Sequence, residues 1–494
     1  MTQALLQTDG YKLFHKDGYH KDIDTVYSNY TSRNGRLSNT PTDGGVVFVG
    51  LQYFIKDVLL GEWNDTFFNL PKAVAISKFK RVVDNYLGIN YDVKHFEDLH
   101  DLGYLPIEIK ALPEGSIVPY QVSPVTFVNT VEGFQWLSNY LETVMSTENW
   151  PIQTAATTAL AYYTRCQKAF KDSGLDEEMC KFMVHDFSFR GMFGRKAAAM
   201  SGFGHLASGL VGTDTLPAIS FAEEYYHANV EEELVGCSVP ATEHSTATSY
   251  IMIEAEKKGI TKLEAEVDYI KYLFTKVPTG IVSHVSDSFD FWSFVTEGLV
   301  SLKEEIMKRE GTLVVRPDSG DPVAVLCGTG KHNDAEAKGL IECLWDIFGG
   351  TINEKGYKVL DSHIGAIYGD SITLQRQDEI YKRLMAKGFA PNVVLGVGSY
   401  SYQYVTRDTH GSAVKATNVK LKGKSQEVCK DPKTDSKKKS AKGLLRIEKE
   451  DGKFVMYDQQ TEEQEREGLL ETVFLDGKLI KETSLEAIRK RILG

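Results

Sequence analysis

The stretch Thr312-Leu-Val-Val-Arg-Pro-Asp-Ser-Gly320 is an apolar, β-branched run that ends in a small polar loop. The same pattern occurs three more times, in Gly280-Ile-Val-Ser-His-Val-Ser-Asp-Ser288, Ile364-Gly-Ala-Ile-Tyr-Gly-Asp-Ser371 and Asn392-Val-Val-Leu-Gly-Val-Gly-Ser399. Helix-length amphipathic stretches, such as residues 377–387, lie between the runs. Strands that alternate with helices predict parallel strands joined by helical crossovers. We therefore expect an α/β fold with an irregular (β/α) barrel-like domain.

The length of the chain allows more than one domain, because ~100–200 residues per domain is usual and this chain has 494. We expect the barrel-like catalytic domain over residues 151–400. Residues 1–150 and 400–494 are predicted to form a mixed α/β sheet domain together, since the alternating tail resembles a return to the first sheet. Residues 420–442 are lysine-rich and predict a basic flexible loop, either a solvated surface loop or a flap over a polyanionic ligand.

Composition narrows the function classes. The chain is 42% hydrophobic and 25% charged, with a formal net charge of -12, which argues against a general nucleic-acid binder. No apolar run approaches the ~20 residues that span a bilayer, and the start lacks the pattern of a signal peptide. The six cysteines are scattered and form no C-x-x-C pair, which predicts reduced thiols in a cytoplasmic protein.

The polar residues just past the predicted strands are the candidate active site, because ligands of parallel sheets and barrels bind there. Gly398-Ser399 and Gly369-Asp370 follow apolar strands, and glycines allow backbone N–H groups to approach a phosphate. Neither loop has the G-x-G-x-x-G or G-x-x-x-x-G-K-[ST] spacing, so a Rossmann dinucleotide site and a Walker NTPase are disfavoured. Ordinary turns, which also favour Gly, Asp and Ser, are the alternative for any single loop.

Further side chains suit a planar base and a sugar. Arg316 offers a planar cation, and Asp318 can hold a ribose diol or a metal-bound water; an internal Arg–Asp pair is equally possible. Phe187 can stack on a ring or pack in the core, and Asp214 can accept an amide N–H. His244 can gain a proton or a phosphoryl group near neutral pH, although a histidine taken alone is more often structural.

Motifs along nearly the whole chain resemble the nicotinamide phosphoribosyltransferases, type II phosphoribosyltransferases of the nicotinate phosphoribosyltransferase superfamily. The motifs occur in the expected order: Thr8-Asp-Gly-Tyr-Lys-Leu-Phe-His15, Leu105-Pro-Ile-Glu-Ile-Lys-Ala111, His185-Asp-Phe-Ser-Phe-Arg-Gly191, Gly212-Thr-Asp-Thr215, Ser238-Val-Pro-Ala-Thr-Glu-His-Ser-Thr246, Val285-Ser-Asp-Ser-Phe-Asp290, Arg316-Pro-Asp-Ser-Gly-Asp-Pro322 and Gly443-Leu-Leu-Arg446. The resemblance implies a cytoplasmic enzyme of NAD salvage. It would make nicotinamide mononucleotide and pyrophosphate from nicotinamide and phosphoribosyl pyrophosphate.

The resemblance also assigns roles to particular residues. Phe187 and Tyr11, the latter from a partner subunit, would stack on the pyridine ring, while Asp214 and Arg316 contact the carboxamide. His244 would be phosphorylated from ATP, with Glu243 and Asp287 orienting it. The remaining residues surround the sugar and phosphates: Ser283, Asp318, Gly369, Asp370, Gly398, Ser399, Arg33, Arg190, Arg407, Lys415 and Lys438.

The implied chemistry needs electrostatics more than a protein nucleophile, because displacing pyrophosphate passes through a cationic sugar and an anionic leaving group. Mg²⁺ would neutralise the pyrophosphate, ATP would be a co-substrate, and the enzyme would be a homodimer with shared sites. The chain departs from the family at Gly398-Ser-Tyr-Ser401, where relatives carry a run of glycines, and at Gly10, where serine is familiar. The Gly280–His284 segment, which contains Ser283, is longer than its counterpart in the family.

Three other readings stay open from the sequence. A nicotinate-specific phosphoribosyltransferase would share the fold, but the carboxylate of Asp214 would repel nicotinate. A catalytically silent relative would act as a binding protein, against which the presence of His244, Asp214, Arg316 and Asp318 argues. An aldolase-type barrel would require a Schiff-base lysine at a strand end, and the four quoted strand ends contain none.

Overall fold

A computed structural model describes residues 3–40, 44–330, 334–429 and 441–494 of the chain. They divide into two compact units. Unit 1 contains residues 1–157, 220–231 and 405–494, and unit 2 contains residues 158–219 and 232–404. The segment 220–231, which the sequence places inside the barrel-like domain, thus belongs to the unit built from the two ends of the chain.

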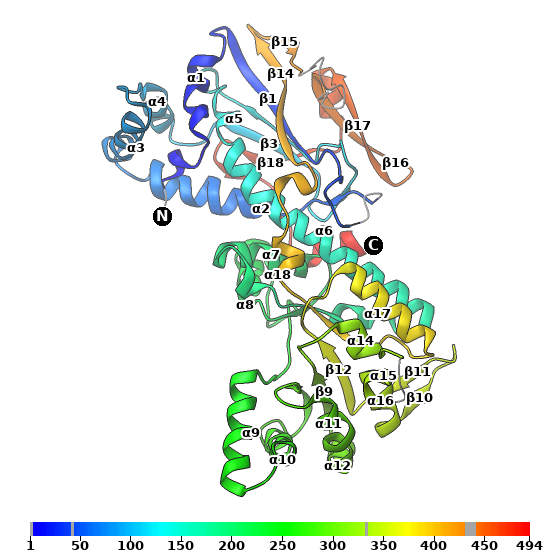
Figure 1. The fold of residues 1–494 in the computed structure, drawn as a ribbon. Coiled ribbons are helices and arrows are strands. Elements are labelled where there is room, and N and C mark those ends of the chain that lie inside the picture. Colours follow the sequence, from blue (N-terminus) through cyan, green and yellow to red (C-terminus); the bar gives the residue numbers. More distant parts are fainter. Residues whose placement is uncertain (1–2, 41–43, 331–333, 430–440) are drawn as a thin grey trace. The chain divides into compact units, whose positions relative to one another are not determined.

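Unit 2 is organised around a parallel sheet, so the predicted α/β class is confirmed. Its strands run in the order β7-β6-β13-β12-β9-β8, and every neighbouring pair is parallel. The strands are β6 (Val184–Asp186), β7 (Gly212–Thr213), β8 (Gly280–Val285), β9 (Gly311–Arg316), β12 (Ile364–Tyr368) and β13 (Val394–Val397). The four repeated sequence patterns therefore supply four strands of a single sheet, of which β9 and β12 are labelled in Figure 1.

The two edges of this sheet are bridged by one stretch of chain. Cys237 pairs with Gly212 of β7, and Ala241 pairs with Ser283 of β8, both in parallel. Four backbone hydrogen bonds of 2.7–3.0 Å secure these bridges. The sheet consequently curls towards a barrel, and the stretch that closes it leads directly to His244.

Helices connect the strands of unit 2, as parallel pairing requires. They include α7 (Arg195–Ala207), α9 (His244–Lys258), α10 (Lys262–Lys276), α14 (Pro322–Cys327), α16 (Leu340–Phe348) and α17 (Leu374–Ala386), and α18 (Ser399–Gln403) follows the last strand. Helix α17 covers the amphipathic stretch predicted at residues 377–387, and Thr373 caps it by accepting the N–H of Arg376. Helices α9 and α10 pack side by side through an apolar cluster that includes Ala247, Ile251 and Tyr269 (Figure 1).

Unit 1 contains a seven-stranded antiparallel sheet in the order β15-β14-β1-β5-β3-β18-β19. Its strands are β1 (Ile23–Thr31), β3 (Ile107–Ala111), β5 (Val125–Asn129), β14 (Ala413–Leu421), β15 (Lys424–Glu427), β18 (Glu471–Leu475) and β19 (Lys478–Leu479). Since β1, β3 and β5 come from the first part of the chain and the other strands from its last part, the sheet combines both ends of the chain, as predicted for the α/β sheet domain. Helices α3 (Lys72–Leu87) and α4 (Lys94–Leu102) contribute buried side chains to its core.

Two local features differ from the sequence-based expectation. One helix, α6 (Glu142–Ser173), runs through Pro151, where a helix boundary is the ordinary outcome of a proline. Within the predicted loop at 420–442, β14 extends to Leu421 and β15 pairs with it through the turn Lys422-Gly423. Both turn residues have positive φ, as a two-residue hairpin turn requires. Residues 430–440 of that loop lie outside the described part of the chain.

Among the described residues, no helix is both long and apolar enough to cross a membrane.

Candidate active site

The candidate site residues of unit 2 lie where the parallel strands end. Phe187 follows β6, Asp214 follows β7, Asp287 follows β8, and Arg316 ends β9. The pairs Gly369-Asp370 and Gly398-Ser399 follow β12 and β13 in the same way. Because the carboxyl ends of parallel strands meet at one edge of a sheet, these six segments share one rim, as the sequence predicts.

His244 and Asp287 are hydrogen-bonded to each other at this rim. His244 Nε2 lies 3.0 Å from Asp287 Oδ1, and the His244 side chain is 47% exposed whereas that of Asp287 is 6% exposed. The other carboxylate oxygen of Asp287 accepts the N–H of Asp318 at 3.0 Å and the hydroxyl of Ser319 at 2.5 Å. Burial acts to raise the pKa of Asp287, but these hydrogen bonds and His244 together lower it. Asp287 is therefore an ionised group that holds the His244 ring by one nitrogen.

His244 is also the first residue of the 15-residue helix α9. The unsatisfied N–H groups and the dipole at a helix N-terminus favour negative charge, so the position suits a group that gains a phosphoryl. Glu243, predicted to orient His244, instead precedes the helix, where its carboxylate accepts the hydroxyl of Ser245 and its N–H donates to Thr246 Oγ1 at 3.4 Å. The structure thus gives Glu243 a local capping contact and gives the contact with the imidazole to Asp287.

Arg316 reaches from β9 to the stretch that closes the sheet. Its Nη2 donates to the carbonyl oxygen of Thr242 at 2.8 Å, while its Nε is buried and has no hydrogen-bond partner. The hydroxyl of Ser283 on β8 is buried and without a partner too. Buried polar atoms are usually hydrogen-bonded, so such atoms at a strand rim indicate places where a ligand supplies the partner.

Phe187 lies against two glycines of the neighbouring strands. A Cβ at Gly369 would lie 3.0 Å from the Phe187 ring, and one at Gly396 would overlap the ring. Phe187 is half-buried, and its backbone N–H donates to the carbonyl oxygen of Val397 at 2.9 Å. Glycine at both positions thus lets the ring lie across β12 and β13, and the ring is not fully enclosed in the core.

Asp214 is exposed at the end of β7 and accepts the hydroxyl of Ser238 at 2.9 Å. Next to this strand, burial lowers the pKa of His185, although the charge of Asp214 acts to raise it. The lowered pKa favours the neutral form of His185.

Two further loops complete the rim. The hydroxyl of Ser399 occupies the space above Gly191, where a Cβ would overlap it, so Ser399 packs on the turn that carries Arg190. Asp370 is exposed and accepts the hydroxyl of Ser371 at 2.7 Å. Ser371 has φ 57° and its carbonyl accepts Arg376 Nη1 at 2.6 Å, which holds this loop in a left-handed turn.

The remaining predicted residues belong to unit 1 or lie outside the described chain. Tyr11 is 68% exposed on a short 3₁₀ helix, and Arg33 donates to the carbonyl of Gly411 at 2.7 Å. Arg407 is exposed, with Asp408 3.6 Å away, and Lys415 is exposed on β14. Lys438 lies among residues that are not described.

Sequence reasoning did not single out Thr242, Ser238, Ser319 or Arg376. The first three lie within quoted motifs, so their position was available, but hydroxyl groups are too common in loops to be selected by type. Their contacts with Arg316, Asp214 and Asp287 depend on residues distant in the sequence.

The described residues contain no group of three or more His, Cys, Asp or Glu side chains placed to hold a metal ion. Both oxygens of Asp287 already accept hydrogen bonds, whereas Asp370 and Asp318 are accessible carboxylates at the rim. Mg²⁺ is usually bound by one or two carboxylates together with substrate phosphates. This donor set therefore suits a metal that arrives on a phosphorylated substrate.

The curled parallel sheet, its glycine-rich strand ends and its helix-terminal histidine define a barrel-like α/β enzyme with an anion-binding rim. Residues 182–478 match the family described as "Nicotinate phosphoribosyltransferase (NAPRTase) family". The chain is 46% identical to a nicotinamide phosphoribosyltransferase of Acinetobacter baylyi, covering 98% of this chain and 96% of that protein. It is 33% identical to one of Xanthomonas campestris pv. campestris, covering 99% and 98%.

A solved structure shares the fold at low sequence identity. The nicotinate-nucleotide pyrophosphorylase of Pyrococcus furiosus superposes with a TM-score of 0.56 at 14% identity, covering 99% of this chain and 94% of that chain. The chain belongs to the nicotinate phosphoribosyltransferase family, and it is a phosphoribosyltransferase as the motifs predict.

Proposed function

We propose that this chain transfers the phosphoribosyl group of phosphoribosyl pyrophosphate to nicotinamide, which makes nicotinamide mononucleotide and pyrophosphate for NAD salvage. The proposal is supported by the near full-length similarity to proteins with that name and by the chemistry of the rim. The observation that carries the choice of base is the exposed carboxylate of Asp214 at the end of β7.

The nicotinamide base binds to the ring of Phe187, which packs against Gly369 and Gly396. The pyridine ring stacks on Phe187, Arg316 contacts the carboxamide through its unpartnered Nε, and Asp214 accepts the amide N–H. Nicotinate has a carboxylate in place of that amide, so Asp214 repels it. The carboxylate at this position therefore favours nicotinamide over nicotinate.

The transfer itself breaks the bond between C1′ and the pyrophosphate oxygen and forms one between C1′ and the pyridine nitrogen. The lone pair of the ring nitrogen makes the new bond, and the pyrophosphate leaves with the electron pair of the old one. Asp318 holds the ribose hydroxyls, and the loops at Gly369-Asp370 and Gly398-Ser399 hold the 5′-phosphate. These groups act by positioning and electrostatics, and no side chain forms a covalent bond to the sugar.

ATP phosphorylates His244 in this proposal. Because Asp287 holds Nε2–H, the Nδ1 lone pair is free to attack the γ-phosphorus, and ADP leaves with the bonding electrons. The ionised Asp287 then stabilises the imidazole, which becomes cationic during the step. The N-terminus of α9 favours the negative phosphoryl group that the ring receives. The phosphohistidine adds charge that organises the leaving pyrophosphate.

Mg²⁺, bound on the pyrophosphate, supplies neutralisation of the leaving-group charge. Arg33, Arg190, Arg407, Lys415 and Lys438 hold phosphates, and a homodimer brings Tyr11 of one subunit to the ring bound by the other. All six cysteines are free thiols, which supports a cytoplasmic location.

Product formation from nicotinamide and phosphoribosyl pyrophosphate with Mg²⁺ tests this proposal, with nicotinate in parallel and with or without ATP. We expect nicotinamide mononucleotide from nicotinamide, faster with ATP, and little product from nicotinate. The matched variant His244→Ala should keep the base preference and lose the stimulation by ATP. Turnover of nicotinate instead, or of neither base by folded protein, contradicts the proposal.

A further inference from the structure

A buried acid–base pair lies behind the rim, where the proposed chemistry does not use it. His284 Nε2 on β8 is 2.9 Å from Glu266 Oε1 on α10, and the two side chains are 1% and 3% exposed. The ring also lies edge-on to Tyr269 and Phe294, with centroids 5.7 and 5.6 Å away. A pair this enclosed touches neither solvent nor a bound substrate, so any effect on the reaction passes through its neighbours.

The neighbour that connects the pair to the rim is Thr242. Its hydroxyl oxygen accepts the N–H of Val285 at 2.9 Å and lies 3.2 Å from His284 Nδ1. We assign the proton of the His284 ring to Nε2, which then donates to Glu266. Nδ1 is left as an acceptor, and it accepts the hydroxyl proton of Thr242. Glu266 thus determines which nitrogen of His284 carries the proton, and His284 determines the direction of the Thr242 hydroxyl.

Thr242 holds two parts of the site at once. Its carbonyl oxygen accepts Nη2 of Arg316 at 2.8 Å, and its N–H donates to Ser283 at 3.0 Å. Two residues later, His244 begins α9. Glu266 lies on α10, and α9, which starts at His244, packs against α10. The buried pair and the start of α9 are therefore both in contact with α10.

We propose that the Glu266–His284 pair is a positioning device that holds Thr242, and that Thr242 thereby couples the base-binding Arg316 to the helix that starts at His244. This inference rests on the proposed function of the same rim. It predicts that the ATP effect at His244 reaches nicotinamide binding through Thr242, because a shift of the Thr242 backbone moves the carbonyl that holds Arg316 and the start of α9 together.

The variants Thr242→Val and Thr242→Ser separate positioning from packing. Valine keeps the shape but loses the hydroxyl, whereas serine keeps the hydroxyl. We expect Thr242→Val to raise the nicotinamide KM about tenfold and to remove most of the ATP stimulation. Thr242→Ser should stay within about twofold of the parent protein on both quantities. Glu266→Gln should act in the same direction as Thr242→Val, to a smaller extent.

A matched control is Glu465→Gln in unit 1, which removes a buried glutamate charge paired with Lys110. Both Glu→Gln variants should lower Tm, but only Glu266→Gln should change the nicotinamide KM and the ATP stimulation. Parent-like kinetics for Thr242→Val, or the same kinetic change in Glu465→Gln, overturns the proposal.

A second readout does not depend on turnover. If the parent protein makes no mononucleotide, the proposed function fails, and the connection is then tested by NMR of the His244 ring, assigned with His244→Ala. The ring signal should move in Thr242→Val and stay in place in Thr242→Ser. An unmoved signal in Thr242→Val rejects the connection by itself.

Discussion

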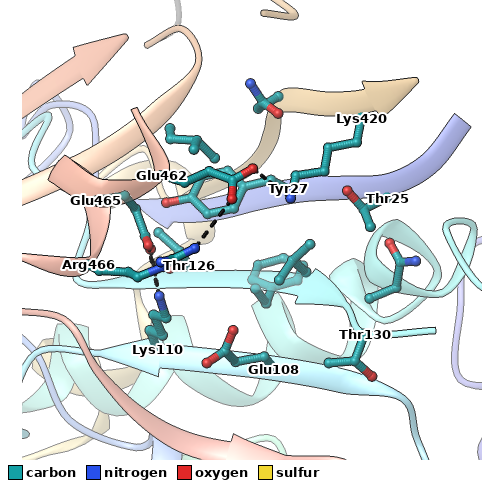
Figure 2. Close-up of a pocket in the computed structure, with 15 residues that line it drawn as sticks. Thr25, Tyr27, Glu108, Lys110, Thr126, Thr130, Lys420, Glu462, Glu465 and Arg466 are labelled. Atoms are coloured by element: carbon teal, nitrogen blue, oxygen red, sulfur yellow. Dashed lines mark hydrogen bonds and ion pairs between the residues drawn. The ribbon is translucent and has the colours of Figure 1, made fainter. Parts of the chain in front are cut away.

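The polar surface of the unit 1 sheet and the strand rim of unit 2 differ in whether their polar side chains have partners within the protein. The unit 1 sheet carries a cavity of about 360 Å³, shown in Figure 2. Each charged side chain that lines it has a protein partner: Lys110 pairs with Glu465 at 2.8 Å, Lys420 with Glu462 at 2.7 Å, Arg466 with Glu462 at 3.3 Å, and Glu108 accepts the hydroxyl of Thr472 at 2.8 Å. The rim of unit 2 instead leaves Ser283 Oγ and Arg316 Nε buried and without hydrogen-bond partners.

The difference teaches that volume alone does not locate a binding site. A cavity whose charges neutralise one another offers a ligand no uncompensated group, since the ligand has to break existing pairs. A rim with unpartnered donors and acceptors gains hydrogen bonds when the ligand arrives. The predictions below test this contrast, from the largest expected effect to the smallest.

Arg316→Ala compared with Lys110→Ala is the strongest test. The Nε atom of Arg316 is buried and has no hydrogen-bond partner in the protein, so we expect it to bind the substrate. Removal of the Arg316 side chain should therefore lower kcat/KM by about 10³-fold. Lys110 is already paired, so its loss should cost about 1–3 kcal/mol of stability and leave kcat/KM within about twofold. Steady-state kinetics and chemical denaturation of both variants measure the two effects. A similar loss of activity in both would remove the distinction between the cavity and the rim.

Mixed subunits test whether the unit 1 residue Tyr11 completes the rim of another copy. Tyr11→Ala should lose the stacking contact and His244→Ala the stimulation by ATP, so neither variant alone should reach the ATP-stimulated rate of the parent protein. Random mixing should restore about a quarter of the sites, because half of the dimers are mixed and each of these has one intact site. Activity of the mixture, with dimer exchange verified by mass, measures this. No recovery in verified mixed dimers counts against shared sites.

Asp214→Asn tests whether the negative charge of Asp214 selects nicotinamide over nicotinate. The amide keeps the size and the contact with Ser238 but removes the repulsion of a carboxylate. The ratio of kcat/KM for nicotinate to that for nicotinamide should rise about tenfold or more. Competition between the two bases provides the measurement, and an unchanged ratio means that another group selects the base.

The pH dependence of stability tests the His244–Asp287 pair. The pKa of Asp287 is lowered in the folded protein, so the carboxylate stabilises the fold above its usual pKa, and this contribution is lost as the pH falls through the lowered pKa. The difference in the free energy of unfolding between the parent protein and Asp287→Asn should be on the order of 1 kcal/mol at neutral pH and should shrink on acidification. A difference that does not change with pH would mean that Asp287 acts by packing alone.

Much of the fold was predictable because it depends on local periodicity. The four apolar runs became β8, β9, β12 and β13, since β-branched runs between amphipathic helices have few alternatives to parallel strands. The chain ends in helix α20 (Leu485–Leu493), which Ser484 caps by accepting the N–H of Ala487. The continuation of α6 through Pro151 was not predictable in this way, because a proline removes one backbone hydrogen bond and usually marks a helix boundary.

The sequence by itself determined the class of fold, the residue types at the strand ends and the family, because periodicity and motif order are properties of neighbouring residues. Only the tertiary structure decided which of those residues meet. It paired His244 with Asp287 rather than with the adjacent Glu243, placed Phe187 on Gly369 and Gly396, and joined Glu266, His284 and Thr242 behind the rim. Such contacts join residues that are tens to hundreds of positions apart, and their geometry follows from strand register and helix packing.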